Sequence, residues 1–501
     1  MSMQIDTATR HAMANALRTL APEARGMSAD SRRLAAGDIF LAYPGRTHDG
    51  RAHIAQAIQA GAAAVVWEAE GWAWDPAWRV PNLPLAGLAR HAASLAATWH
   101  HDPSRALWMT GITGTNGKTS VAHWLAAALS RAGRRTATLG TLGNGFVDVE
   151  GRVAGSHASH TTPDAVTLQG LLAGYRDAGA QGVAMEVSSH GLDQGRVDGV
   201  AFDVAVFTNL SRDHLDYHGS MEAYAAAKSR LFHWPDLGWA VLNTDDELGA
   251  TLAGQLRGGR CRVLSYGLRT GDLRAEDCRA DRHGLRLRIA SPWGGGELVS
   301  GLLGEFNAYN LLASLGALLA ADIPLEQALA ALAEVRPVSG RMQRVPTQES
   351  EPTVIVDFAH TPDALDKVLR SLKPLSGGRL VCVFGCGGGR DTGKRPLMGA
   401  AVAATADLAI VTSDNPRNED PAGIIADILA GMPPGQEAMV DRRAAIRAAI
   451  LAADAEDIVV LAGKGHEDYQ EIQGVRQPFS DFAEARAALR ERAARSQHAP
   501  V

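Results

Sequence analysis

Short apolar runs alternate with longer, alanine-rich amphipathic segments along most of the chain. Runs of about five residues rich in valine, isoleucine and leucine are typical of buried strands, and the segments between them are typical of covering helices. The runs that predict strands lie at residues 38–42, 62–67, 183–187, 204–208, 239–243, 353–357, 380–384, 408–412 and 458–462. This alternation predicts an α/β fold with mostly parallel sheets covered by helices.

Two turn-rich breaks divide this pattern, at residues 100–104 and 336–341. A chain of 501 residues is also too long for one compact domain. We therefore predict three domains, at residues 1–104, 105–338 and 339–501. Alternating arginine and leucine at 260–303 predicts a small antiparallel excursion in the second domain. In the third domain, polar or glycine-rich residues follow each strand, at the edge where open α/β sheets bind ligands.

Composition narrows the class of protein. A net charge of −6 provides no basic field that would favour nucleic acid as a partner. Four cysteines in so long a chain do not indicate a disulfide framework, and we expect Cys382 and Cys386 to be buried thiols. The N-terminus shows no signal-peptide pattern, and the longest apolar stretch, residues 311–321, is too short to span a bilayer. We expect a cytoplasmic protein without membrane insertion.

Residues 111–120, with the sequence GITGTNGKTS, lie between a run at 106–110 that predicts a strand and a segment at 121–129 that predicts a helix. A glycine-rich turn in this position offers backbone N–H groups and the helix dipole to a phosphate chain. Lys118 would reach the terminal phosphates of ATP, and the Thr119 hydroxyl would bind Mg²⁺. Ile112 stands where the usual motif has glycine, so an ordinary glycine-rich turn is the alternative. The order of strand, Lys-Thr pair and helix favours ATP.

Lysine is rare in this chain: the 49 basic residues include lysine only at positions 118, 228, 367, 373, 394 and 464. A sequence that uses arginine for most cations should keep lysine where a compact, titratable amine matters. Glu186 and His214 follow apolar strands in the same domain as Lys118, and both are candidate metal ligands. Taken singly, each also fits a structural role, and Lys228 fits an exposed lysine on a helix.

Many longer motifs follow one another along the chain. They are Asp30-Ser-Arg with Gly37-Asp-Ile-Phe, the phosphate loop, Thr161-Thr-Pro, Glu186-Val-Ser-Ser-His-Gly-Leu, Phe207-Thr-Asn-Leu-Ser-Arg-Asp-His-Leu-Asp-Tyr-His-Gly, Gly304-Glu-Phe-Asn-Ala-Tyr-Asn, Ser339-Gly-Arg-Met, Asp357-Phe-Ala-His-Thr-Pro-Asp, Gly385-Cys-Gly-Gly-Gly-Arg-Asp with Gly393-Lys-Arg-Pro, Asp414-Asn-Pro-Arg and Gly463-Lys-Gly-His-Glu-Asp-Tyr-Gln. This ordered set resembles the Mur ligase family over essentially the whole chain. The likeness is greatest to the members that join meso-2,6-diaminopimelate to UDP-N-acetylmuramoyl-L-alanyl-D-glutamate in peptidoglycan synthesis.

The resemblance implies an N-terminal domain for the UDP-sugar, a central ATPase domain with a mostly parallel sheet, and a C-terminal Rossmann-like domain for the amino acid. ATP would phosphorylate the D-glutamate γ-carboxylate, and the amine of diaminopimelate would attack the acyl phosphate to form an amide. Magnesium would be the cofactor and ATP the co-substrate, and the enzyme would act as a monomer.

The resemblance also implies roles for individual residues. The ATP site would comprise Gly114, Thr115, Asn116, Gly117, Lys118, Thr119, Ser120, Asn307, Asn310, Arg341, Asp357 and His360. The UDP-sugar dipeptide would be held by Ser31, Arg46, Thr47, His48, His160, Thr161, Thr162, Ser188, Gln194 and Arg196, although the family has asparagine where this chain has His160. Diaminopimelate would bind Arg390, Asp414, Asn415, Pro416, Arg417, Gly463 and Glu467. Lys118, Glu186, His214 and Lys228 would be catalytic, and Thr119, Glu186, His214 and a carbamate on Lys228 would hold Mg²⁺.

Arg417 bears on the choice of amino acid. A guanidinium binds a carboxylate in a bidentate manner, and diaminopimelate carries a distal carboxylate where lysine carries only an ammonium group. The alternatives are a lysine-adding muramyl ligase, a ligase like folylpolyglutamate synthetase, and a nucleotide-binding module whose ATP site drives a conformational switch. The N-terminal motifs and Asp414-Asn-Pro-Arg argue against the second, and the motifs for the acceptor substrate argue against the third.

Overall fold

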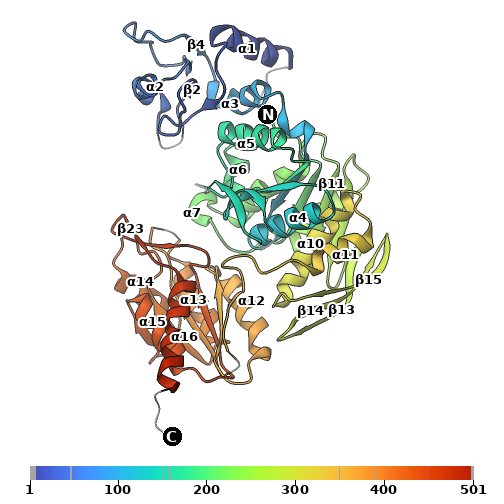
Figure 1. Cartoon of the computed structure of the whole chain (residues 1–501), viewed down its shortest axis with the longest axis vertical. Coiled ribbons are helices and arrows are strands. Elements are labelled where there is room, and N and C mark those ends of the chain that lie inside the picture. Colours follow the sequence, from blue (N-terminus) through green and yellow to red (C-terminus); the bar gives the residue numbers. More distant parts are fainter. Residues whose placement is uncertain are drawn as a thin grey trace.

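The computed structural model describes residues 7–45, 48–148, 151–156, 160–348, 350–389 and 391–497. The described chain forms three parts, each built on its own main sheet, which follow one another along the longest axis of the molecule (Figure 1). The α/β fold class is confirmed. The predicted domain limits at residues 104 and 338 fall between these sheets and stay predictions.

The N-terminal part has a parallel sheet in the order β1-β2-β3-β4. Its elements are α1 (Thr7–Leu20), β1 (Met27–Ser28), β2 (Ile39–Ala42), α2 (Ile54–Gln59), β3 (Ala64–Glu68), β4 (Asn82–Leu85) and α3 (Leu88–Trp99). Helix α3 packs against α5 (Ala165–Asp177) of the next part (Figure 1), and Val166 of α5 enters the N-terminal core. Through this shared core, the N-terminal part packs against the central part.

The central part has an eleven-stranded sheet in the order β15-β14-β13-β12-β11-β10-β5-β9-β6-β7-β8. Its strands are β5 (Trp108–Thr113), β6 (Thr136–Gly140), β7 (Gly143–Val147), β8 (Val153–Ser156), β9 (Gly182–Glu186), β10 (Val204–Phe207), β11 (Trp239–Asn243), β12 (Arg262–Gly267), β13 (Leu273–Asp281), β14 (Gly284–Ser291) and β15 (Gly294–Ser300). The middle of the sheet is parallel, and β13–β15 form the predicted antiparallel excursion.

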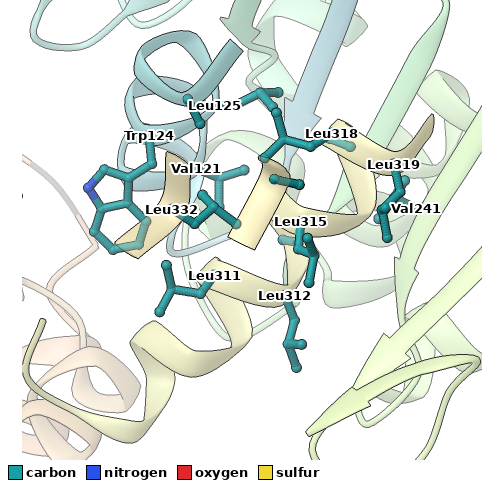
Figure 2. Packing of buried hydrophobic residues seen from close by; sticks show 14 of the residues in the cluster. Val121, Trp124, Leu125, Val241, Leu311, Leu312, Leu315, Leu318, Leu319 and Leu332 are labelled. Carbon is teal, nitrogen blue, oxygen red and sulfur yellow. The ribbon is translucent and has the colours of Figure 1, made fainter. Parts of the chain in front are cut away.

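Helices cover both faces of this sheet, because its strands are apolar on both sides. The helices are α4 (Lys118–Arg131), α5, α6 (Ser189–Asp193), α7 (Leu215–His218), α8 (Met221–Ser229), α9 (Glu247–Leu256), α10 (Glu305–Ala320) and α11 (Leu325–Ala333). Along β10, Val204 and Val206 face the cluster built by α4, α10 and α11, whereas Ala205 and Phe207 face the cluster of α5 and α9. Figure 2 shows Trp124 of α4 and Leu311 of α10 within the first cluster.

The C-terminal part has a sheet in the order β16-β17-β21-β18-β19-β20, parallel except for β16, and a β22–β23 hairpin. Its elements are β16 (Gln343–Val345), β17 (Thr353–Asp357), α12 (Pro362–Leu372), β18 (Leu380–Phe384), α13 (Lys394–Ala403), β19 (Leu408–Thr412), α14 (Pro421–Leu429), β20 (Glu437–Met439), α15 (Arg442–Ala452), β21 (Ile458–Ala462), β22 (Tyr469–Ile472), β23 (Val475–Pro478) and α16 (Asp481–Gln497). Four predicted strands match β17, β18, β19 and β21 to the residue.

The strand predicted at residues 106–110 is displaced. Pro103 opens a short 3-10 helix that ends at Ala106, and β5 then runs from Trp108 to Thr113. Pairing with β9 and β10 on its two sides extends β5 into the glycine-rich segment. The phosphate loop therefore shortens to residues 114–117, and its helix begins at Lys118 rather than at residue 121.

The prediction for two of the cysteines is confirmed. Cys382 and Cys386 are buried free thiols, and burial raises the pKa of each to about 12. No helix among the described residues has the length and apolar content needed to cross a membrane.

Candidate functional site

The loop of residues 114–117 requires glycine at both ends. Gly114 and Gly117 have φ angles of 150° and 86°. A Cβ on Gly114 would lie 1.9 Å from Thr208 Oγ1, and one on Gly117 would lie 2.4 Å from Asn310 Oδ1. Neither position admits a side chain, because the loop backbone passes close to α10 and to the end of β10.

The segment after β10 holds the loop in place. The Thr115 N–H donates to Asn209 O at 2.8 Å, and the Asn116 N–H donates to Asn209 Oδ1 at 3.0 Å. The Thr208 hydroxyl donates to Asn116 O at 2.6 Å. The loop conformation is thus fixed by residues of a neighbouring strand end as well as by its own glycines.

Two lysines, half-buried Lys118 and buried Lys228, point at one carbonyl of this loop. Lys118 Nζ donates to Gly114 O at 2.9 Å, and Lys228 Nζ, from α8, donates to the same oxygen at 2.8 Å. Lys228 is 1% exposed, so the interpretation as an exposed helical lysine is wrong; α8 turns this side chain inward. Burial, and after it the charge of Lys118, holds the pKa of Lys228 well below its usual value. Burial also lowers the pKa of Lys118.

Glu186, the last residue of β9, is 1% exposed and faces the first turn of α4. Its carboxylate accepts the Thr119 hydroxyl at 3.0 Å and the Thr141 N–H at 2.7 Å. A Cβ at Gly140 would lie 2.2 Å from Glu186 Oε1, so this glycine leaves room for the carboxylate. A buried carboxylate bonded only to neutral groups, next to a hydroxyl, is a suitable pair of ligands for a hard cation.

His214 follows β10 with a φ of 53°, and its Nε2 lies 3.5 Å from Asp213 Oδ2. Burial, together with His190 and the two lysines, lowers the pKa of His214 to about 3 against the opposing effect of Asp213. The neutral ring keeps a lone pair available for a metal. In the described parts of the chain, however, no three His, Cys, Asp or Glu side chains form a ready metal-binding group. Glu186 and His214 are therefore not part of a preformed three-ligand cluster.

Helix α10 supplies two asparagines beside the loop. Asn310 Nδ2 donates to Asn307 Oδ1 at 3.0 Å, and Asn307 Nδ2 donates to Leu303 O at 2.8 Å. Both asparagines are buried. Their hydrogen bonds fix the amide of Asn310 against Gly117, at the start of the phosphate-loop helix.

Residues of the C-terminal part also lie beside the phosphate loop. Arg341 Nη2 donates to Thr119 Oγ1 at 3.4 Å, and its guanidinium lies 4.1 Å from the centre of the Phe358 ring. Arg341 Nη1 is buried and has no hydrogen-bond partner among the described residues. Burial lowers the pKa of His360 to about 4 and raises that of Asp357, which accepts the Met342 N–H at 2.7 Å. A buried guanidinium N–H without a partner, beside a phosphate loop, fits an anionic ligand.

Two further pairs join these parts. Asn116 Nδ2, in the loop, donates to Asp363 Oδ2 at 3.2 Å. Arg212 Nη2 lies 3.5 Å from Asp391 Oδ2. Helix α12 thereby contacts the phosphate loop, and the loop before α13 contacts the segment after β10.

The residues expected to hold the dipeptide converge next to Glu186. The Thr162 hydroxyl donates to Glu186 O at 2.9 Å and is bonded to Ser188, whose N–H donates to it at 3.0 Å. Arg196 Nη1 donates to Thr162 O at 2.9 Å, and its Nη2 donates to Gln194 Oε1 at 2.7 Å. This cluster adjoins Glu186, which in turn bonds Thr119 at the start of the phosphate-loop helix.

The other residues expected to contact the UDP-sugar are more scattered. Thr161 Oγ1 accepts the Thr141 hydroxyl at 3.2 Å, and burial lowers the pKa of the neighbouring His160. In the N-terminal part, the Ser31 hydroxyl donates to Gln56 Oε1 at 2.9 Å, and His48 O accepts the Gly45 N–H at 2.8 Å. Arg46 and Thr47 lie outside the described residues.

The expected amino-acid residues come together at the ends of β19 and β21. Asn415 Nδ2 donates to Glu467 Oε2 at 2.8 Å, and the Arg417 guanidinium donates to Gly388 O. Gly463 has a φ of 114°, and a Cβ there would lie 2.4 Å from Asp414 Oδ2. Pro416 lies between Asn415 and Arg417 in the same loop, and Arg390 lies outside the described residues.

Sequence reasoning noted Lys464 but gave it no role. Its Nζ is fully buried and donates to Asn415 Oδ1 at 3.0 Å and to Glu467 Oε2 at 2.9 Å. Asp213, which lies between His214 and His360, was missed altogether. The rarity of lysine was the signal for Lys464, whereas the position of Asp213 depends on the meeting of two parts of the chain.

Family models match most of the chain in three segments. The Mur ligase family catalytic domain matches residues 23–100, the Mur ligase middle domain matches residues 112–318, and the Mur ligase glutamate ligase domain matches residues 340–465. The chain belongs to the Mur ligase family. The predicted family resemblance is thus confirmed.

Curated members of the family share about half of the sequence. The protein named UDP-N-acetylmuramoyl-L-alanyl-D-glutamate–2,6-diaminopimelate ligase of Chromobacterium violaceum is 52% identical over 92% of this chain and 94% of its own length. The protein of the same name from Pseudomonas aeruginosa is 50% identical over 93% of this chain and 95% of its own length.

Solved structures agree on the fold. A structure with the same ligase name is 39% identical, with a TM-score of 0.65, and covers 94% of this chain and 95% of its own chain. The Mycobacterium tuberculosis folylpolyglutamate synthase complexed with ADP and AMPPCP is 20% identical over 82% of this chain and 95% of its own, with a TM-score of 0.62, which shows a shared fold alone. The sequence relatives therefore favour a muramyl ligase over a ligase like folylpolyglutamate synthetase.

Proposed function

We propose that this Mur ligase is an ATP-dependent ligase that adds meso-2,6-diaminopimelate to the D-glutamate γ-carboxylate of UDP-N-acetylmuramoyl-L-alanyl-D-glutamate. One observation carries the proposal: Asn116 of the phosphate loop and Thr119 of its helix contact Asp363 and Arg341, which belong to the part of the chain that holds the Asp414–Arg417 loop. This contact supports an activating site and an amine-binding site on neighbouring parts of the chain. The high identity to curated ligases of this name supports the same conclusion.

The proposed reaction has two steps, phosphorylation of the carboxylate and attack by the amine. A carboxylate is a poor electrophile, and phosphorylation turns one of its oxygens into a leaving group. Lys118 and the unpartnered Arg341 N–H neutralise the phosphates of ATP during this transfer. Thr162, Ser188 and Arg196 hold the dipeptide so that its γ-carboxylate meets the terminal phosphate. The amine bound at the C-terminal domain then attacks the acyl phosphate, and phosphate leaves.

Lys228 acts as a carbamate. Because burial holds its pKa low, the amine stays uncharged and nucleophilic. Its lone pair adds to the carbon of CO₂ and one proton is released, so that a neutral amine becomes an anion, a change that the permanently protonated guanidinium of arginine cannot undergo. Thr119, Glu186, His214 and this carbamate would hold Mg²⁺, whose charge would stabilise the transferring phosphoryl group.

Arg417 selects the amino acid. Its guanidinium now donates to a backbone carbonyl, Gly388 O, which a distal carboxylate of diaminopimelate replaces as a charged and stronger acceptor. Asn415, Asp414 and Glu467 bind the ammonium end. An L-lysine-adding ligase is the competing candidate, and it lacks a use for this guanidinium.

The remaining assignments follow from this proposal. Residues 1–104 bind the UDP-sugar, 105–338 bind ATP and 339–501 bind the amino acid. The enzyme acts as a monomer in the cytoplasm, where its nucleotide-linked substrates are made.

The test is the mass of the product. The enzyme is incubated with ATP, Mg²⁺ and UDP-N-acetylmuramoyl-L-alanyl-D-glutamate, together with either meso-diaminopimelate or L-lysine. We expect a tripeptide product with diaminopimelate and little with lysine. Equal product with lysine would reject the amino-acid assignment, and ATP hydrolysis independent of both acceptors would reject the ligase.

A further inference from the structure

The C-terminal domain contains a fully buried ion pair between Arg442, the first residue of α15, and Asp481, the first residue of α16. Both side chains are 0% exposed. The pair is bidentate, with Arg442 Nε 2.8 Å from Asp481 Oδ1 and Nη2 2.6 Å from Asp481 Oδ2. The Mur ligase reaction described above does not use either residue.

The other hydrogen bonds of Arg442 reach two strand ends. Nη2 donates to Ala462 O at 2.9 Å, and Nη1 donates to Ser413 O at 3.4 Å. Ala462 is the last residue of β21 and immediately precedes Gly463, whereas Ser413 follows β19 and immediately precedes Asp414. One guanidinium therefore touches the backbone just before both loops of the amino-acid site.

No sheet pairing joins these two strand ends to each other. In the sheet order, β18 lies between β21 and β19. The two loops nevertheless meet closely, since Asp414 Oδ2 fills the space above Gly463, and Asn415 hydrogen-bonds Glu467 at 2.8 Å. Arg442 joins the two sides of β18, because it bonds the backbone of both Ala462 and Ser413.

A buried ion pair of this kind is not expected to add much to the stability of the fold. Burying two charges costs much of what their attraction returns, and well-packed apolar side chains of similar volume are often as stable. A planar fork that binds a carboxylate on one side and two carbonyls on the other provides geometry that an apolar contact does not.

We propose that Arg442 and Asp481 are positioning residues for the amino-acid site, and that α16 is part of this site through them. The pair fixes the spacing between the Asp414–Arg417 loop and the Gly463–Glu467 loop. This inference rests on the proposed function, because it takes these loops to be the amino-acid site.

The experiment compares two double variants on the same two helices. Arg442→Met with Asp481→Leu replaces the buried pair by apolar side chains. Arg447→Met with Glu491→Leu replaces an exposed bidentate pair that also joins α15 to α16, with Arg447 Nε 2.7 Å from Glu491 Oε2. Both variants are assayed for kcat and for KM of each of the three substrates, and their melting temperatures are measured.

We expect the buried-pair variant to raise KM for diaminopimelate about tenfold or more, with KM for ATP and for the UDP-sugar within about twofold of wild type. The control should leave all three KM values unchanged. Amide hydrogen exchange, which needs no activity, should be faster in residues 414–417 and 463–467 of the buried-pair variant only.

A KM for diaminopimelate equal to that of the control, or an equal loss towards all three substrates, would overturn the inference. If the double variant does not fold, Arg442→Lys serves instead: it keeps the charge but not the fork, and it should raise the same KM. A wild-type enzyme that forms no diaminopimelate adduct would reject the proposed function, whereas the hydrogen-exchange result would still decide the role of Arg442.

Discussion

Lys228 and Lys464 are both fully buried, yet their surroundings are opposite. Lys228 has a carbonyl, Gly114 O, at 2.8 Å and an aromatic ring at 4.4 Å, and the charge with the largest effect on its pKa is the like charge of Lys118, which Asp213 opposes less strongly. Lys464 lies 2.9 Å from the Glu467 carboxylate and 3.0 Å from Asn415 Oδ1. In the central domain, Lys228 bonds a neutral carbonyl. In the C-terminal domain, Lys464 bonds a carboxylate and an amide oxygen, so that a negative charge lies next to its amine.

This difference separates a reactive group from a fixed one. A buried amine without a counter-ion favours its neutral, nucleophilic form. A buried amine bonded to a carboxylate and to an amide oxygen is held in one position and orders both partners. Two residues of one type, equally hidden from solvent, therefore suit chemistry in one domain and substrate positioning in the other.

The largest effect should come from removing the reactive lysine. Lys228→Ala should lower kcat by about 10²–10³-fold, because the proposed carbamate, which would help to stabilise the phosphoryl transfer, cannot form. Added short-chain carboxylic acids should restore part of the activity by occupying the vacated space. Steady-state assays with and without acetate measure this.

The control for Lys228→Ala is Lys373→Ala, a half-exposed lysine paired with Asp407 away from the site, which should retain wild-type activity. Full activity of Lys228→Ala without added acid would exclude the carbamate. Lys228 would then not be the reactive member of the two buried lysines.

A second variant probes the C-terminal site alone. Arg417→Ala should raise KM for diaminopimelate by about 10²-fold, because a charge-assisted pair with the distal carboxylate is lost. KM for ATP should stay within about twofold, since the guanidinium contacts Gly388 O and not the phosphate loop. Unchanged kinetics with diaminopimelate would remove Arg417 from the specificity argument.

Lys464→Met tests the fixed lysine. The substitution leaves Glu467 and Asn415 without their shared donor, which we expect to cost about 1–3 kcal/mol of stability. KM for diaminopimelate should rise about tenfold as Glu467 loses its orientation, while kcat falls less. Thermal unfolding and substrate titration check both. An active, equally stable variant would show that Lys464 only fills space.

Buried parallel strands were the most predictable part of this fold. Each is a continuous apolar run, and the runs at 353–357, 380–384, 408–412 and 458–462 are found unchanged as strands. The β6–β8 edge and the β22–β23 hairpin were not predicted. Their strands carry glycine and polar residues, as in Gly143–Val147 and Tyr469–Ile472, so no run marks them.

The site was predictable where its pattern is local. The glycines, Lys118 and Thr119 lie within one short segment, and the strand that ends at Glu186 is visible in the sequence. The contact between Lys464 and Asn415 joins residues 49 apart, and that between Arg341 and Thr119 joins residues 222 apart. Such contacts depend on how strands and domains meet. The ligand roles taken from the family resemblance stay predictions.

The smallest effect should be on stability, and it should have opposite signs at the two lysines. Lys228→Met should raise the melting temperature by roughly 1–3 °C in CO₂-free buffer at neutral pH, because an apolar side chain avoids the cost of a buried amine. Gly114 O keeps its bond from Lys118 Nζ at 2.9 Å, so no acceptor is left without a donor. Lys464→Met should lower the melting temperature instead.

The increase in melting temperature caused by Lys228→Met should also depend on pH. Because folding lowers the pKa of Lys228 below its ordinary value of 10.5, the unfolded wild type binds more protons below that pH, and wild-type stability rises as the pH is raised towards 10.5. Methionine does not titrate, so the gap between the two proteins should narrow over the same range. Melting curves from pH 7 to 10 measure the gap. A gap that is constant with pH, or a methionine variant less stable than wild type, would show that Lys228 is compensated as Lys464 is.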